Sequence, residues 1–218
     1  MKNLIISKYN QLSILIIITV LSGALLMLRI KLTQSLYLLF LVWNAFLAFI
    51  PYAISFIGRL YPTLSTKKGI RILLLIIWIL FLPNAPYILS DFTHLRWTSP
   101  QFLLIDTLII TSFSLLGLLY MYYSVRDMQQ LYFSTLSRKQ NLLLLIGLCI
   151  LLGFGIYLGR YLRWNSWDLI QNPERLLNDI SALITHPIRN KFAWFITLAY
   201  ATISGVTINI LNRLKWTH

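Results

Sequence analysis

The chain has 218 residues, of which 58% are hydrophobic and 11% are charged, and its formal net charge is +13. This composition excludes an ordinary soluble domain, in which roughly a quarter of the residues are charged. In a soluble protein the positive charge would favour nucleic acid. Here the lysines and arginines flank apolar runs, so we expect no nucleic-acid partner and contact with anionic lipid headgroups instead.

Six apolar runs are candidates for crossing a bilayer, whose hydrocarbon core is about 30 Å thick. They predict an all-α membrane protein, a single polytopic domain over residues 1–218 with six transmembrane helices. The predicted crossings are residues 13–30, 35–57, 70–90, 100–123, 142–162 and 192–211. Because six crossings return the chain to its starting side, we expect both termini on one side of the membrane.

The third crossing has an apolar run that is too short. Residues 72–82 give about 17 Å of helix at 1.5 Å per residue, so a segment with two prolines must cover the remaining depth. Each proline removes an N–H donor and clashes with the preceding turn. Such backbone is tolerated at membrane depth only where protein or a water-filled cavity covers it. We therefore predict a helix interrupted at Pro83–Pro86 beside a polar cavity, with Asn84 and Tyr87 as candidate substrate-binding residues.

Two further polar side chains lie within predicted crossings. Asn44 lies near the middle of the second crossing, where an interhelical hydrogen bond worth about 1 kcal/mol and a role in ligand binding are equally open. Asp106 lies about 9 Å inside the start of the fourth crossing by helical rise. An ionisable group at such a depth indicates a functional role.

The end of the fifth crossing carries a second polar stretch. Arg160 and Arg163 are three residues apart and suit a phosphate or carboxylate, although both could instead extend to lipid headgroups beside an interfacial Trp167. Asn165 and Asp168 have the spacing of a capping box. Asp168 could alternatively pair with one of the arginines.

An amphipathic helix is predicted at residues 173–185, between the fifth and sixth crossings. Leu176, Ile180 and Leu183 share one face, and Glu174 and Asp179 lie opposite. This pattern is typical of a helix that lies in the membrane interface.

The distribution of lysines and arginines predicts the orientation. On the side of the termini lie Lys2, Lys8, Arg59, Lys67, Lys68, Arg71, Arg126, Arg138, Lys139, Arg213 and Lys215. On the other side lie Arg29, Lys31, Arg96, Arg160, Arg163, Arg175, Arg189 and Lys191. The bias favours cytoplasmic termini. The broken third crossing, the start of the fourth and the end of the fifth then converge at the outer face.

Several of these motifs together resemble an uncharacterised family of bacterial integral membrane proteins, a domain of unknown function. They are Leu82-Pro83-Asn84-Ala85-Pro86-Tyr87 with the following Asp91 and His94, and Arg163-Trp164-Asn165-Ser166-Trp167-Asp168. The resemblance implies a multi-pass protein of the bacterial plasma membrane and supplies no activity.

Asp91 and His94 are candidates for acid–base or metal chemistry, because a spacing of three places them on one helix face. Asp168 would complete a catalytic set with them, and Asp168 or Asp106 could complete a set of metal ligands. A metal site would use Asp91 and His94, but no zinc-binding motif accompanies them, and the sequence leaves any cofactor unspecified. The alternative is that Ser90 or Asp91 caps a short helix.

Three functional hypotheses follow. The first is a protein that binds, or an enzyme that acts on, an anionic lipid or lipid-linked substrate at the outer face, using Asp91, His94 and Asp168 with the two arginines of the fifth crossing. The second is a small ion-coupled transporter that uses Asn44, Asn84 and Asp106; the missing inverted repeat weakens it. The third is a non-catalytic membrane scaffold or assembly partner.

Overall fold

The fold is known from a computed structural model that describes residue 6 and residues 8–63 and 67–214. Six of its helical segments are long and apolar enough to cross a membrane. They are α2 (Tyr9–Thr33), α3 (Phe40–Leu60), Lys68–Trp97, Pro100–Tyr132, α8 (Arg138–Arg160) and α11 (Lys191–Arg213). The predicted all-α membrane protein with six spanning helices is confirmed.

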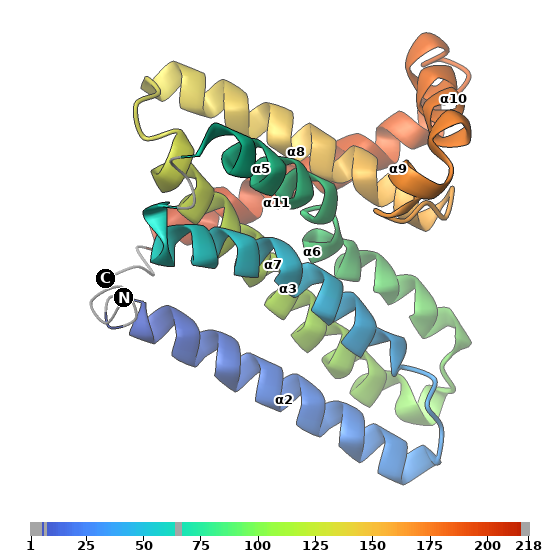
Figure 1. The fold of residues 1–218 in the computed structure, drawn as a ribbon. Helices are drawn as coiled ribbons and strands as arrows, with labels where there is room; N and C mark the ends of the chain where they lie inside the picture. The colour runs from blue at the N-terminus through green and yellow to red at the C-terminus, as the bar shows by residue number, and fades with distance from the viewer. Residues whose placement is uncertain (1–5, 7, 64–66, 215–218) are drawn as a thin grey trace. The chain divides into compact units, whose positions relative to one another are not determined.

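The described residues form two compact units. The first contains the chain up to Thr135 and from Thr207 onward, and the second contains Leu136–Val206. In the first unit α2 and α3 both pack against α7 (Leu103–Tyr132), as Figure 1 shows. The connection from α2 to α3 and the segment that leads into α7 lie at the same end of this unit (Figure 1).

Helix α7 is the centre of the first unit. Besides α2 and α3, it contacts the broken third crossing, and most of its side chains between Ser112 and Met128 are buried. Helix α2, by contrast, exposes apolar side chains on several faces, as expected for a helix in contact with lipid. The core therefore forms around α7.

The third crossing is interrupted where the two prolines predict it. Helix α5 (Lys68–Phe81) ends before Pro83, and the short α6 (Asn84–Tyr87) leads into a 3₁₀ helix, η1 (Ile88–Trp97). A 3₁₀ helix rises about 2.0 Å per residue against 1.5 Å in an α-helix. The ten residues of η1 thus cover about 20 Å, which supplies the depth that the apolar run lacks.

A glycine lets α7 approach this break closely. A Cβ atom added to Gly117 would lie 2.2 Å from the carbonyl oxygen of Ala85 in α6. Because that neighbour is backbone, it cannot move aside as a side chain would. Gly117 therefore fixes the broken crossing against the central helix.

A hydrogen-bond chain links three helices of the first unit. The indole N–H of Trp78 in α5 donates to the Ser124 hydroxyl over 2.7 Å, and this hydroxyl donates to the Pro51 carbonyl oxygen over 2.8 Å. Pro51 lies inside α3. Ser124 thus gives α7 a polar contact with both neighbouring helices.

The second unit has α8, α9 (Asp168–Gln171), α10 (Pro173–Thr185) and most of α11. Helix α10 has the predicted bounds, with Pro173 in its first turn and Leu176 and Leu183 buried. Gly153 in α8 permits close packing against α11. A Cβ atom there would lie 2.0 Å from the Thr197 carbonyl oxygen.

Candidate functional site

A polar cluster lies at the end of the first unit where η1 meets α3. The Asp91 side chain is fully buried, and its Oδ2 accepts a hydrogen bond of 2.8 Å from the Asn44 amide. Its Oδ1 lies 3.7 Å from Nδ1 of His94, one turn further along η1. Of the two alternatives for Asn44, the interhelical hydrogen bond is present and joins the second crossing to the third, while the role in ligand binding stays a prediction.

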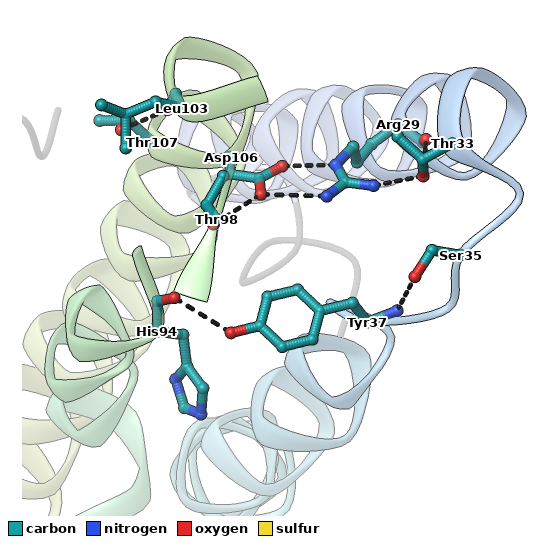
Figure 2. A network of polar contacts seen from close by, with 9 residues as sticks. All are labelled: Arg29, Thr33, Ser35, Tyr37, His94, Thr98, Leu103, Asp106 and Thr107. Atoms are coloured by element: carbon teal, nitrogen blue, oxygen red, sulfur yellow. Dashed lines mark hydrogen bonds and ion pairs between the residues drawn. The ribbon is translucent and has the colours of Figure 1, made fainter. Parts of the chain in front are cut away.

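His94 lies between this buried carboxylate and the surface. Its side chain is 26% exposed, and its ring packs against Phe40 with the centroids 4.6 Å apart. Nδ1 lies 3.2 Å from the Asp91 carbonyl oxygen. The Tyr37 hydroxyl donates to the carbonyl oxygen of His94 over 3.0 Å (Figure 2). These contacts hold η1 and the imidazole against the start of α3.

A second buried carboxylate lies at the same end. Asp106 in α7 accepts hydrogen bonds from the Arg29 guanidinium of α2, with Nε 2.6 Å from Oδ1 and Nη2 3.2 Å from Oδ2. The Thr98 hydroxyl donates to Oδ2 over 2.9 Å. Figure 2 shows the guanidinium between Asp106 and Thr33, whose hydroxyl it also contacts. Asp106 is fully buried, so this ion pair offsets a large desolvation cost.

The two carboxylates are suited to different tasks. Asp106 is bound by an arginine, which keeps its charge in proteins, so it holds α2 and α7 together. Asp91 faces an amide and an imidazole, and an imidazole can gain or lose a proton near neutral pH. A buried carboxylate beside a partly exposed imidazole can orient that ring and stabilise its protonated form.

The helix-capping alternative for this segment is wrong. Ser90 and Asp91 lie inside η1, and Tyr87 is the residue that precedes the helix. Asn84 donates its amide N–H to the Phe81 carbonyl oxygen over 2.9 Å, and this bond closes the end of α5. Tyr87 is half-buried in α6. The substrate-binding roles of Asn84 and Tyr87 stay predictions.

The described residues contain no group of three or more His, Cys, Asp or Glu side chains that could hold a metal ion. Asp91 and His94 are thus a pair without a third ligand of these types.

The second polar stretch lies in the second unit. Asp168 is buried, and its Oδ2 accepts hydrogen bonds from the Asn165 backbone N–H over 2.6 Å and from the Asn165 amide over 3.3 Å. One of the two hydrogen bonds of the predicted capping box, from the backbone N–H of the capping residue to the side chain three residues later, is therefore present. The Asn165 side chain binds the Asp168 carboxylate rather than a backbone N–H.

The arginines of this stretch and Trp167 lie close in sequence to that turn. Arg163 is exposed and has a left-handed backbone (φ 61°), a conformation rare outside glycine. Arg160 ends α8. Trp167 lies just before α9 and is 36% exposed. Arg160, Arg163 and Trp167 belong to the second unit, whereas Asp91 and His94 belong to the first. That these residues converge on one site stays a prediction, as does the catalytic role of Asp168.

Sequence reasoning missed the partner of Asp106. It treated Arg29 as a charge that marks the membrane boundary, whereas the guanidinium is buried in an ion pair. A second ion pair joins Lys8 before α2 to Asp127 in α7. The residue numbers held a signal, because Lys8 and Arg29 are 21 residues apart (29 − 8), as are Asp106 and Asp127 (127 − 106). Equal spacing of opposite charges is what two antiparallel helices paired at both ends require.

Comparison with known proteins finds one family. The sequence pattern described as "Protein of unknown function (DUF1361)" matches residues 43–206. No curated protein and no solved structure matches the chain. The match covers the broken third crossing, all of α7 and the second polar stretch.

Proposed function

The chain belongs to the DUF1361 family, whose description assigns no activity, and from the geometry of the first unit we propose that this multi-pass membrane protein binds an anionic headgroup. The headgroup is that of a lipid or a lipid-linked substrate. It lies over η1, where His94 reaches the surface.

The observation that carries this proposal is the Asp91–His94 pair. Asp91 is fully buried at the end of a spanning helix, where an ionised carboxylate is costly unless it has partners. Its partners include the Asn44 amide and the His94 imidazole. A protonated imidazole would balance the Asp91 charge and present an N–H donor to a phosphate.

The surface of η1 supports an anionic ligand. Arg96 is exposed, and its guanidinium lies 5.8 Å from the ring centroid of Trp97, which is 73% exposed. A tryptophan with one apolar and one polar edge is typical of the headgroup layer, and a nearby arginine attracts anionic headgroups. Arg96 and Trp97 thus favour placing the end of η1 in the headgroup layer, where an anionic ligand of His94 would lie.

The same charge distribution supports an orientation. With both termini in the cytoplasm of a bacterium, η1 lies at the outer face of the plasma membrane, following the excess of basic residues on the terminal side. The proposed ligand is then an outer-leaflet headgroup.

Chemical modification of histidines tests the headgroup site. Purified protein in detergent is treated with diethyl pyrocarbonate, and the rate at each histidine is measured by mass spectrometry, with phosphatidylglycerol or phosphatidylcholine added. We expect phosphatidylglycerol to slow modification of His94 about tenfold, because a hydrogen bond to a charged group contributes about 1.5–3 kcal/mol. The exposed His186 of the second unit is an internal control and should react at the same rate in both lipids.

The variant Asp91→Asn sharpens this test. An asparagine can still accept the hydrogen bond from Asn44 but cannot stabilise a protonated His94, so the difference between the two lipids should largely disappear. If phosphatidylglycerol protects His94 and His186 equally, or protects His94 equally in the variant, the headgroup site at η1 is excluded. The scaffold hypothesis would then account better for the polar cluster.

A further inference from the structure

The opposite end of the first unit carries a cluster of charged side chains with a different balance. Lys8 forms an ion pair with Asp127, and the Arg59 Nε at the end of α3 lies 3.9 Å from Asp127 Oδ1. Arg126, next to Asp127 in α7, contacts Tyr122 through its Nη1 and over the ring. We call Lys8, Arg59, Arg126 and Asp127 the basic cluster.

Positive charge exceeds negative charge in the basic cluster. The chain has six acidic side chains; three belong to the first unit, and two of these, Asp91 and Asp106, lie at its other end. Asp127 must therefore serve three cations. Lys8 and Asp127 are both buried, so water screens their charges poorly.

Lys8, which precedes the membrane-spanning part of α2, is a cation buried within this cluster. Burial lowers the pKa of the Lys8 ammonium from its ordinary value, and the guanidiniums of Arg59 and Arg126 lower it further. Asp127 opposes both effects without cancelling them. The lowered pKa of Lys8 thus reflects burial first and the neighbouring guanidiniums second.

Arg59 supplies an independent observation. Its side chain is 30% exposed, yet its Nε is buried and has no hydrogen-bond partner among the described residues. A buried donor without a partner costs about 1–3 kcal/mol, and more when it is charged. A ligand oxygen at this position would remove the cost.

We propose that the basic cluster binds a phosphate group through Arg59, Arg126 and Lys8. The group is either the phosphodiester of an anionic lipid on the side of the termini or inorganic phosphate. Guanidiniums match phosphate oxygens in geometry and charge, and one bound anion would offset the positive excess. The partly exposed Arg59 gives the ligand access from the headgroup layer.

Binding is measured by thermal unfolding of the purified protein in detergent, with phosphatidylglycerol, phosphatidylcholine, sodium phosphate or sodium chloride at matched ionic strength. All variants are made on a His94→Ala background, which removes the contribution proposed for the other end. The variants are Arg59→Gln and Arg126→Gln. Arg71→Gln is the matched control, because Arg71 is an exposed arginine at the start of α5, near the same end of the unit.

We expect phosphatidylglycerol or phosphate to stabilise the parent protein more than phosphatidylcholine or chloride does. Arg59→Gln and Arg126→Gln should each weaken the apparent affinity about tenfold, since each removes a charge-assisted hydrogen bond of about 1.5 kcal/mol or more. Arg71→Gln should leave the affinity unchanged. Stabilisation by inorganic phosphate identifies a free anion as a ligand, and stabilisation by phosphatidylglycerol alone identifies a lipid.

Two results would overturn the proposal. One is equal stabilisation by the anionic compounds and their controls. The other is an equal loss of affinity in the Arg59, Arg126 and Arg71 variants, which would indicate general attraction to the membrane surface. Unfolding without ligand shows whether each variant is folded, and two separate arginine variants keep the test valid if one fails to fold.

Discussion

A buried ion pair joins α2 to α7 at each end of the two helices, but the two ion pairs differ in their chemistry. At one end Arg29 pairs with Asp106, and at the other Lys8 pairs with Asp127. The first pair has one cation for one carboxylate and two further hydrogen bonds, one from the guanidinium to the Thr33 hydroxyl and one from the Thr98 hydroxyl to the carboxylate. The second shares its carboxylate with Arg59 and lies beside Arg126.

This difference shows that a buried ion pair can hold two helices together with or without local neutrality. Arginine stays charged in proteins, so Arg29 needs its carboxylate at every accessible pH. Burial and the neighbouring guanidiniums lower the pKa of Lys8 from its ordinary value. The two ends should therefore respond differently to the loss of their carboxylate.

Among substitutions that test this difference between the two ends, Asp106→Ala should have the largest effect on stability. It leaves the Arg29 guanidinium buried without a counter-charge, and breaking such a pair costs about 3–5 kcal/mol. We expect a loss of this size in the free energy of unfolding, measured by denaturant titration in mixed micelles. The double variant Arg29→Met/Asp106→Leu, which removes both charges, should recover most of the loss. Equal losses in the single and double variants would contradict the role of the ion pair.

The packing between the two ends is tested by Gly117→Ala. The new methyl group would overlap the Ala85 carbonyl oxygen, so α6 and α7 must move apart, at a cost of about 2–3 kcal/mol for overpacking. The matched control is Gly23→Ala in α2, where a Cβ atom meets nothing within 4 Å. This control should be neutral or stabilising by up to about 1 kcal/mol. A neutral Gly117→Ala would show that α7 does not depend on close contact with the break.

The smallest effect is expected for Asp127→Ala, at about 1–2 kcal/mol near neutral pH. Removing Asp127 removes the group that opposes the lowered pKa of Lys8, so this pKa falls further in the folded state. The unfolded chain then binds more protons than the folded one, and stability rises with pH up to the ordinary lysine pKa of about 10.4.

The pH dependence therefore distinguishes the two ends. The deficit of Asp127→Ala should shrink between pH 7 and about pH 10, while that of Asp106→Ala should stay constant because Arg29 remains charged. Unfolding titrations at several pH values measure both. A deficit that does not change with pH in Asp127→Ala would show that Lys8 keeps its proton.

Much of the fold could be predicted because a membrane-spanning helix is recognisable in the sequence from the length and hydropathy of its apolar run. The interruption at Pro83–Pro86 was predictable because two prolines follow an apolar run that is too short to cross the bilayer, whereas the single Pro51 lies within a continuous α3. The fourth crossing was predicted to end at 123, but α7 continues to Tyr132. The charged residues at 126 and 127 indicate a loop when taken alone, but both have partners within the unit: Arg126 contacts Tyr122, and Asp127 pairs with Lys8 and Arg59.

The candidate site was predictable in part. Asn44 and Asp91 were each identified, but their pairing depends on how α3 packs against η1, which periodicity does not reveal. Arg29 was misjudged because a basic residue at a helix end has two meanings, a boundary signal or a buried partner. Only the equal spacing of opposite charges along α2 and α7 distinguishes the buried partner from the boundary signal.

That equal spacing also fixes the distance between the two ion pairs, which can be compared with the thickness of a bilayer. Twenty-one residues of α-helix span about 31 Å, close to the thickness of a hydrocarbon core. Since both ends are fastened, neither helix can slide along the other to suit a thicker or thinner membrane. Adaptation must come from tilting the pair or deforming the surrounding lipid, at a cost for every ångström of mismatch. The protein should accordingly favour membranes whose thickness matches the distance between its two ion pairs.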